Sequence, residues 1–151
     1  MTPEAKTLRK ACANFSKDLH ALPETAFAHQ FGEKTRTVAD IVYEVILVND
    51  HVGMCIRGEE PFDWPESQWI TAPNDFNTKS VVVEAFDASA AKITETADSF
   101  SEEDLKVAVQ TEHGETNRSE RLRFMALHLW YHSGQLNFIQ TLLGDDGWHW
   151  N

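Results

Sequence analysis

Apolar residues recur at alternating intervals of three and four in four segments of the chain, with polar residues between them. This spacing is typical of amphipathic helices that bury one face. Helix-capping residues and breakers then set the ends of each segment. The predicted helices cover residues 2–24, 37–57, 78–99 and 119–143.

The last of these segments, 119–143, has the clearest pattern. Asn117 with Glu120 three residues later predicts its N-cap, and Gly144 predicts its end. The residues expected on its buried face are Leu122, Met125, Leu129, His132, Leu136, Ile139 and Leu143.

The second segment, 37–57, is apolar on more than one face, so we expect deep burial. Its β-branched residues would also allow a strand, but its length and the cap formed by Thr37 and Asp40 favour a helix. Residues 107–117 alternate apolar and polar side chains around Gly114, which predicts a small two-stranded ribbon.

Residues 58–77 form an unusually long predicted loop that contains three prolines and four aromatic residues. Fully extended, it reaches ~60 Å, enough to return the chain along a helix and to start the next helix parallel to the previous one. Its aromatic residues either cover apolar surface, which would shield Trp64 and Trp69 from solvent, or line a substrate opening.

These elements together predict an all-α protein, a four-helix bundle with one long crossover loop. The 151 residues suit a single domain over 1–151.

The chain has 13 basic and 24 acidic residues and a formal net charge of −11. Because it lacks a basic cluster, we expect neither nucleic acid nor an anionic membrane as a partner. Cys12 and Cys55 lie far apart, which predicts reduced thiols in a cytoplasmic protein. No apolar run is long enough to cross a membrane.

His128 and His132 are four residues apart, so their imidazoles share one helix face. Such a pair can share a metal ion, or it can fill a bundle core with satisfied hydrogen bonds. The H-E-x-x-H motif, the G-x-S-x-G motif and a glycine-rich phosphate loop are all absent. The remaining chemistry is a metal held by facing helices.

The second predicted helix offers two candidates for a third metal ligand, Glu44 and His51. They are seven residues apart, about 10 Å along the axis, so they cannot easily bind one ion. Both can also reach solvent as ordinary surface residues. The residues alone leave this choice open.

The segment HLWYHSGQLNFIQTLLG, residues 128–144, resembles the last helix of the DinB-like family of small bacterial four-helix bundles. TVADIVYEVILVNDHVGMCIRGEEP, residues 37–61, is similar to that family's second helix. The resemblance implies a divalent metal, which the family holds with three histidines, and this sequence departs from that triad at the first position. His128 and His132 match the last two ligands, and counting from both ends of the second helix places the first at Glu44, with His51 as the alternative third ligand.

The resemblance also implies a homodimer and a metal-dependent enzyme, either a hydrolase or a thiol-dependent transferase, that uses Zn²⁺, Ni²⁺ or Fe²⁺. Its partner would then be a small-molecule or thiol substrate. The alternative hypothesis is a non-catalytic bundle that binds a small molecule or partner without a metal.

Overall fold

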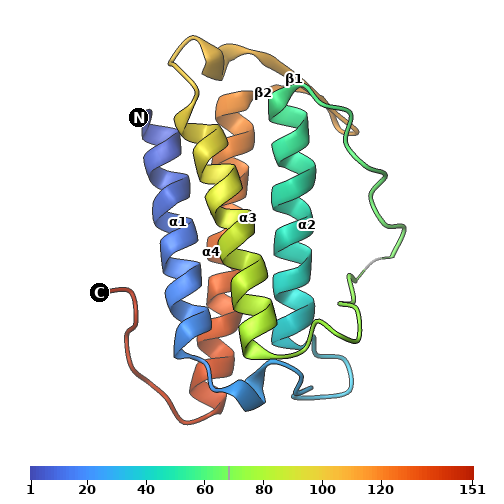
Figure 1. Ribbon diagram of the computed structural model, residues 1–151, viewed down its shortest axis with the longest axis vertical. Coiled ribbons are helices and arrows are strands. Elements are labelled where there is room, and N and C mark those ends of the chain that lie inside the picture. The colour runs from blue at the N-terminus through green and yellow to red at the C-terminus, as the bar shows by residue number, and fades with distance from the viewer. Residues whose placement is uncertain (68) are drawn as a thin grey trace.

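The computed structural model describes residues 1–67 and 69–151 and confirms the predicted four-helix bundle with its small ribbon (Figure 1). Each predicted helix end lies within a few residues of the observed one. The helices are α1 (Pro3–Ala21), α2 (Val38–Arg57), α3 (Lys79–Asp98) and α4 (Arg118–Leu142); two single 3-10 turns are η1 (Glu24–Ala26) and η2 (Asp104–Lys106); the strands are β1 (Ala108–Thr111) and β2 (Gly114–Asn117).

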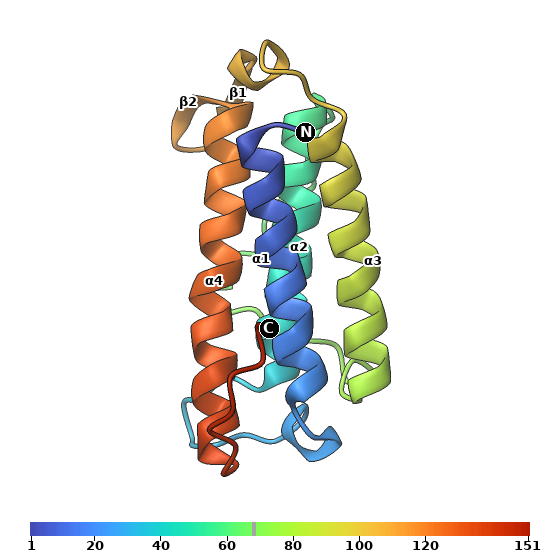
Figure 2. The same cartoon turned by 90° about the vertical axis from the view of Figure 1, so that its left-hand side faces the viewer.

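The helices form a bundle in which α1 and α4 run in one direction and α2 and α3 run in the other (Figures 1 and 2). α1 packs against α3 and α4, and α2 packs against the same two helices. α2 and α4 are therefore antiparallel neighbours, which sets side chains of the second helix against the histidines of the fourth.

Local capping interactions set the helix ends as predicted. Thr37 and Asp40 form a reciprocal capping box at the start of α2. Asn117 accepts a hydrogen bond from the Glu120 backbone at the start of α4. Gly58 follows α2 with a φ of 76°, a left-handed conformation that glycine adopts without steric cost.

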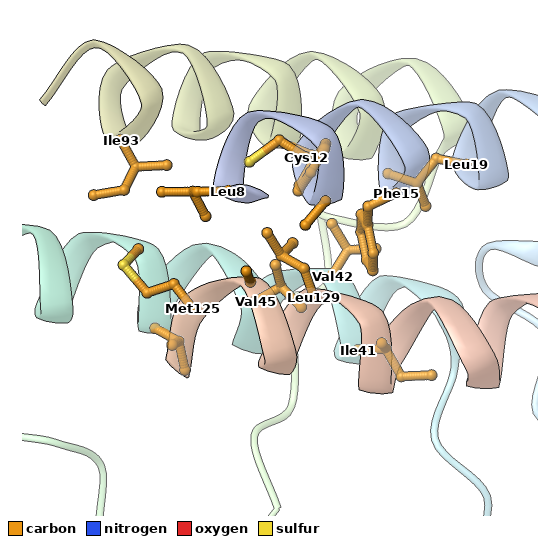
Figure 3. Packing of buried hydrophobic residues seen from close by; sticks show 14 of the residues in the cluster. Leu8, Cys12, Phe15, Leu19, Ile41, Val42, Val45, Ile93, Met125 and Leu129 are labelled. Atoms are coloured by element: carbon orange, nitrogen blue, oxygen red, sulfur yellow. The ribbon is translucent and has the colours of Figure 1, made fainter. Parts of the chain in front are cut away.

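The apolar seams of the four helices meet in one core, as Figure 3 shows for side chains of α1, α2 and α4. Phe15 of α1 packs on Phe86 of α3 with ring centroids 4.7 Å apart. Burying such side chains is the main source of bundle stability, at about 1.5–3 kcal/mol each. The sequence pattern predicts Leu143 on the buried face of the last helix, but it is 40% exposed. The reason is that α4 ends at Leu142, so the helical periodicity does not continue to Leu143.

The crossover loop runs back along α2, and α3 starts parallel to α2 as predicted (Figure 1). The Trp64 ring lies edge-on to His51, centroids 5.6 Å apart. Further along the loop, the Ala72 backbone donates a hydrogen bond to Asp40 Oδ1 at 2.8 Å. Asp40 thus caps α2 with one oxygen and anchors the loop with the other.

The two loop tryptophans differ in burial. Trp64 is half-buried and packs against the core. Trp69 is 61% exposed, so the expectation that both are shielded is wrong for Trp69. Its ring contacts the Arg36 guanidinium, 5.3 Å from the ring centroid, and this cation–π contact holds it at the rim of the bundle instead of on the core.

Both cysteines are free. Cys12 is buried in the core, and this burial raises the pKa of its thiol to about 12. Cys12 therefore remains a neutral thiol and acts as a small apolar core residue. No helix among residues 1–67 and 69–151 is long and apolar enough to cross a membrane.

The C-terminal residues 143–151 fold back along the bundle, and the chain ends beside α1 (Figure 2). Trp150 Nε1 donates a hydrogen bond of 2.9 Å to Asp18 Oδ1, and Lys17 Nζ donates one of 2.7 Å to the Asn151 carbonyl. Asp18 is only 1% exposed, and burial raises its pKa above the ordinary value. An ionised carboxylate in this position costs stability.

This burial predicts a pH-dependent effect of Asp18→Asn. As pH rises from 4 to 7, the unfolded chain loses the Asp18 proton first, so wild-type stability falls between the unfolded and folded pKa values. The neutral amide does not titrate. Urea unfolding at several pH values should therefore show the variant gaining stability relative to wild type as pH rises. A constant difference would contradict the raised pKa.

Candidate metal centre

Three side chains that can bind a metal meet between the antiparallel helices α2 and α4. Glu44 comes from α2, and His128 and His132 come from adjacent turns of α4. Their side chains are 18%, 14% and 3% exposed, respectively. The cluster therefore lies at the edge of the core and is largely screened from water.

The separations of the ligand atoms fit a single ion. His128 Nε2 and His132 Nε2 are 3.1 Å apart, and Glu44 Oε1 lies 3.4 Å from His132 Nε2 and 3.7 Å from His128 Nε2. Two atoms that each bind a zinc-like ion at about 2.1 Å are roughly 3.0 Å apart at a right angle and roughly 3.4 Å apart at the tetrahedral angle. Only small side-chain shifts separate the cluster from either geometry.

Protonation states also favour a cation. Contacts with His128 and His132, reinforced by Arg36, hold the pKa of Glu44 well below its usual range. Burial lowers the pKa of His128. At neutral pH the cluster thus contains a carboxylate and a neutral imidazole, the forms that bind metal ions.

Gln135 fixes the tautomer of His132. Its Oε1 accepts a hydrogen bond from His132 Nδ1 at 2.7 Å, so Nδ1 carries the proton and the Nε2 lone pair points into the cluster. His128 Nδ1 is buried and has no partner among the described residues. The stacking of Phe124 on the His128 ring, centroids 5.9 Å apart, orients that ring instead.

Arg36 fixes the carboxylate of Glu44. Its Nη2 donates to Glu44 Oε2 at 2.6 Å and to the Asp40 carbonyl at 3.3 Å. This leaves Oε1 free to face the two imidazoles. The guanidinium also compensates the negative charge of a carboxylate that is mostly out of water.

His51, the alternative third ligand, does not join the cluster. It lies two turns beyond Glu44 on α2, and its ring packs edge-on against Phe62 and Trp64. The crossover loop thus covers this side chain. The other histidines, His20, His29, His113 and His149, lie outside the cluster as well.

Sequence reasoning missed Arg36, Gln135 and Tyr131, whose ring packs edge-on against His132 at 5.0 Å between centroids. Gln135 carried a usable signal, because a residue three positions after His132 lies on the adjoining helix face. Arg36 carried none: it precedes the N-cap of α2, where no periodicity applies.

Comparisons with known proteins agree with this architecture. A crystal structure of a conserved protein from Enterococcus faecalis superposes with a TM-score of 0.71 at 16% identity, covering 96% of this chain and 99% of that one. A mycothiol-dependent maleylpyruvate isomerase gives a TM-score of 0.65 at 19% identity, covering 88% of this chain and 59% of the isomerase. A structure of a histidine-to-alanine variant of that isomerase gives the same TM-score, identity and coverage.

At these identities the two structures show the shared fold alone. Comparison with curated protein sequences gave no significant match. The sequence itself matches the DinB superfamily over residues 7–136, most of its length. The chain belongs to the DinB superfamily.

Proposed function

We propose that Glu44, His128 and His132 hold a divalent transition-metal ion and form the centre of a metal-dependent enzyme. The observation that supports this most directly is the convergence of three ligand atoms within 4.8 Å of one another. Two imidazoles and a carboxylate suit Zn²⁺, Ni²⁺ or Fe²⁺.

When bound, such an ion lowers the pKa of a coordinated water or thiol and so supplies a nucleophile near neutral pH. The protein groups around it would orient the ligands. Arg36 holds the Glu44 carboxylate and Gln135 holds the His132 ring, while Tyr131 and Phe124 pack on the imidazoles and limit access of water.

Two reaction classes fit such a site, hydrolysis and thiol-dependent transfer or isomerisation. The structural similarity to a mycothiol-dependent isomerase supports the second as a hypothesis. The chain spans 59% of that enzyme's length, so we extend only the use of a thiol to it, and not the whole reaction.

A second candidate is a non-catalytic bundle without a metal. The salt bridge between Arg36 and Glu44 and the 3.1 Å contact between the two imidazoles favour it, because these contacts already partner the Glu44 carboxylate and the Nε2 atoms of both histidines. The cluster would then be a structural network between α2 and α4.

Metal content separates the two candidates. Protein purified without a histidine tag should contain about one equivalent of a transition metal, and Zn²⁺ in excess should raise its melting temperature, because a ligand of the native state stabilises it. Glu44→Ala, His128→Ala and His132→Ala should each lose the metal and keep their helical circular dichroism. His51→Ala is the matched control and should retain it.

A wild-type protein with less than about one-tenth equivalent of metal and no thermal stabilisation would favour the metal-free bundle. Loss of the metal in His51→Ala with retention in Glu44→Ala would assign the third ligand to His51.

Gln135 should control metal affinity by holding the His132 ring. Gln135→Ala removes the acceptor for Nδ1–H and should weaken Zn²⁺ binding by roughly 10–100-fold in a competition titration. Gln135→Glu keeps an acceptor there and should restore most of the affinity. Equal affinity for Gln135→Ala and wild type would show that the contact does not orient the ligand.

We also propose that the protein forms a homodimer through an outer row of apolar residues on α4. The outer row consists of Phe124 and Leu127, which are 40% and 67% exposed on the first half of α4. An apolar surface of this kind is typical of a contact site, and one helix face can pair with its own copy about a two-fold axis.

Light scattering should accordingly give a mass twice the 17.2 kDa of one chain. Leu127→Glu, at a position 67% exposed in the outer row, should give the monomer because it would bury a charge in the interface. Val81→Glu, an exposed apolar position on α3, should leave the dimer intact. A monomeric wild type would refute the proposal.

A further inference from the structure

A cavity of about 520 Å³ opens beside the cluster of Glu44, His128 and His132. Its size suits a small organic molecule. We call it the groove. It lies between the connector before α2, the crossover loop and the second half of α4. Its walls include Lys34 and Arg36 of the connector, Trp69 of the loop, and Tyr131, Gly134 and Phe138 of α4.

Three wall residues contact the cluster directly. Arg36 pairs with Glu44, Gln135 pairs with His132, and the Tyr131 ring packs on the His132 ring. A molecule in the groove would therefore touch the residues that position the candidate ligands. We therefore consider the groove as the substrate-binding site of the proposed metal centre. This assignment rests on the proposed function.

The charge of the walls is opposite to that of the protein. The chain has 24 acidic and 13 basic residues, yet the described wall residues include the two cations Lys34 and Arg36 and no carboxylate. Lys34 is exposed and forms no ion pair or hydrogen bond with any residue that the structure describes. Because Glu44 compensates the charge of Arg36, Lys34 is the cation that the described wall offers to a ligand, and a cation at the rim of an apolar groove favours an anionic group there.

The remaining walls are mostly apolar and aromatic. Trp69 stands on one side, with its ring against the Arg36 guanidinium, and Tyr131 and Phe138 stand on α4. These rings are largely accessible: Trp69, Tyr131 and Phe138 are each more than 60% exposed to solvent. Flat apolar side chains of this kind bind the hydrocarbon or aromatic body of a ligand.

Gly134 supports this assignment independently. It lies inside α4, where glycine is less favourable to the helix than alanine. An added Cβ there would meet no atom within 4 Å, so packing does not require glycine. Gly53 inside α2 differs, because its added Cβ would lie 3.2 Å from Ile93. The space that Gly134 leaves open is part of the groove.

We propose that the groove binds a small organic anion with an apolar, preferably aromatic, body. Its acidic group pairs with Lys34, and its body lies between Trp69 and the rings of α4. Because Gly134 has no side chain, that body can lie against α4 next to Gln135 and the cluster.

The test uses three probes of the same shape and different charge: 2-naphthoate, neutral 2-naphthamide and cationic 2-naphthylmethylamine. Calorimetric titration should show naphthoate binding roughly threefold to tenfold more tightly than the amide, with the amine weakest, because one charge-assisted pair with the exposed Lys34 ammonium is worth up to about that factor. Equal affinities for the acid and the amide would overturn the proposal.

Two variants locate the binding. Gly134→Leu fills the groove and should abolish naphthoate binding, while its melting temperature stays the same or rises because leucine favours helix. Lys34→Gln should weaken naphthoate by roughly threefold to tenfold and leave the amide unchanged. Lys10→Gln, an exposed lysine on α1 outside the groove, is the matched control. Wild-type naphthoate affinity in Gly134→Leu would also refute the groove.

The titrations are run on Zn²⁺-loaded protein and on protein treated with a chelator. Naphthoate binding that is lost in Gly134→Leu in both forms supports the groove even where the protein holds no metal. Metal binding without naphthoate binding refutes the groove and leaves the metal site intact. The two proposals therefore fail separately.

Discussion

The interaction on which the site depends is the compensation of one carboxylate that is mostly out of water. Glu44 would cost several kcal/mol there without partners. Arg36 pairs with one of its oxygens, and the two imidazoles of α4 face the other. These contacts join the connector, α2 and α4, so the same pairings that make Glu44 tolerable also align the three candidate ligands.

The crossover loop makes this arrangement possible. Because it returns the chain along α2, α2 and α3 run parallel and α4 runs antiparallel to α2. Asp40 ties the loop to α2, and Trp69 contacts Arg36, the residue that holds Glu44. The crossover loop therefore covers His51, forms a wall of the groove and contacts Arg36, which holds the Glu44 carboxylate. The proposed ligand groove and the candidate metal centre therefore share Arg36, Tyr131 and Gln135.

Several site residues follow from local rules. His128 and His132 share a face because they are four apart on one helix, and Gln135 adjoins them for the same reason. Glu44 faces them in the structure, where counting along the second helix had placed it. Arg36 and Trp69 could not be predicted, because each lies outside a periodic segment and acquires its role from a contact between elements distant in sequence.

The sequence by itself determined the four helices, their caps and their buried faces, because apolar periodicity and capping act within a few residues. It also determined that two imidazoles project from one helix face. Only the tertiary structure decided which side chain of α2 faces them, that Trp69 is exposed at a groove wall while Trp64 packs inward, and that Lys34 and Arg36 lie at that groove. These features depend on how helices joined by long loops are aligned, and no local pattern encodes that alignment.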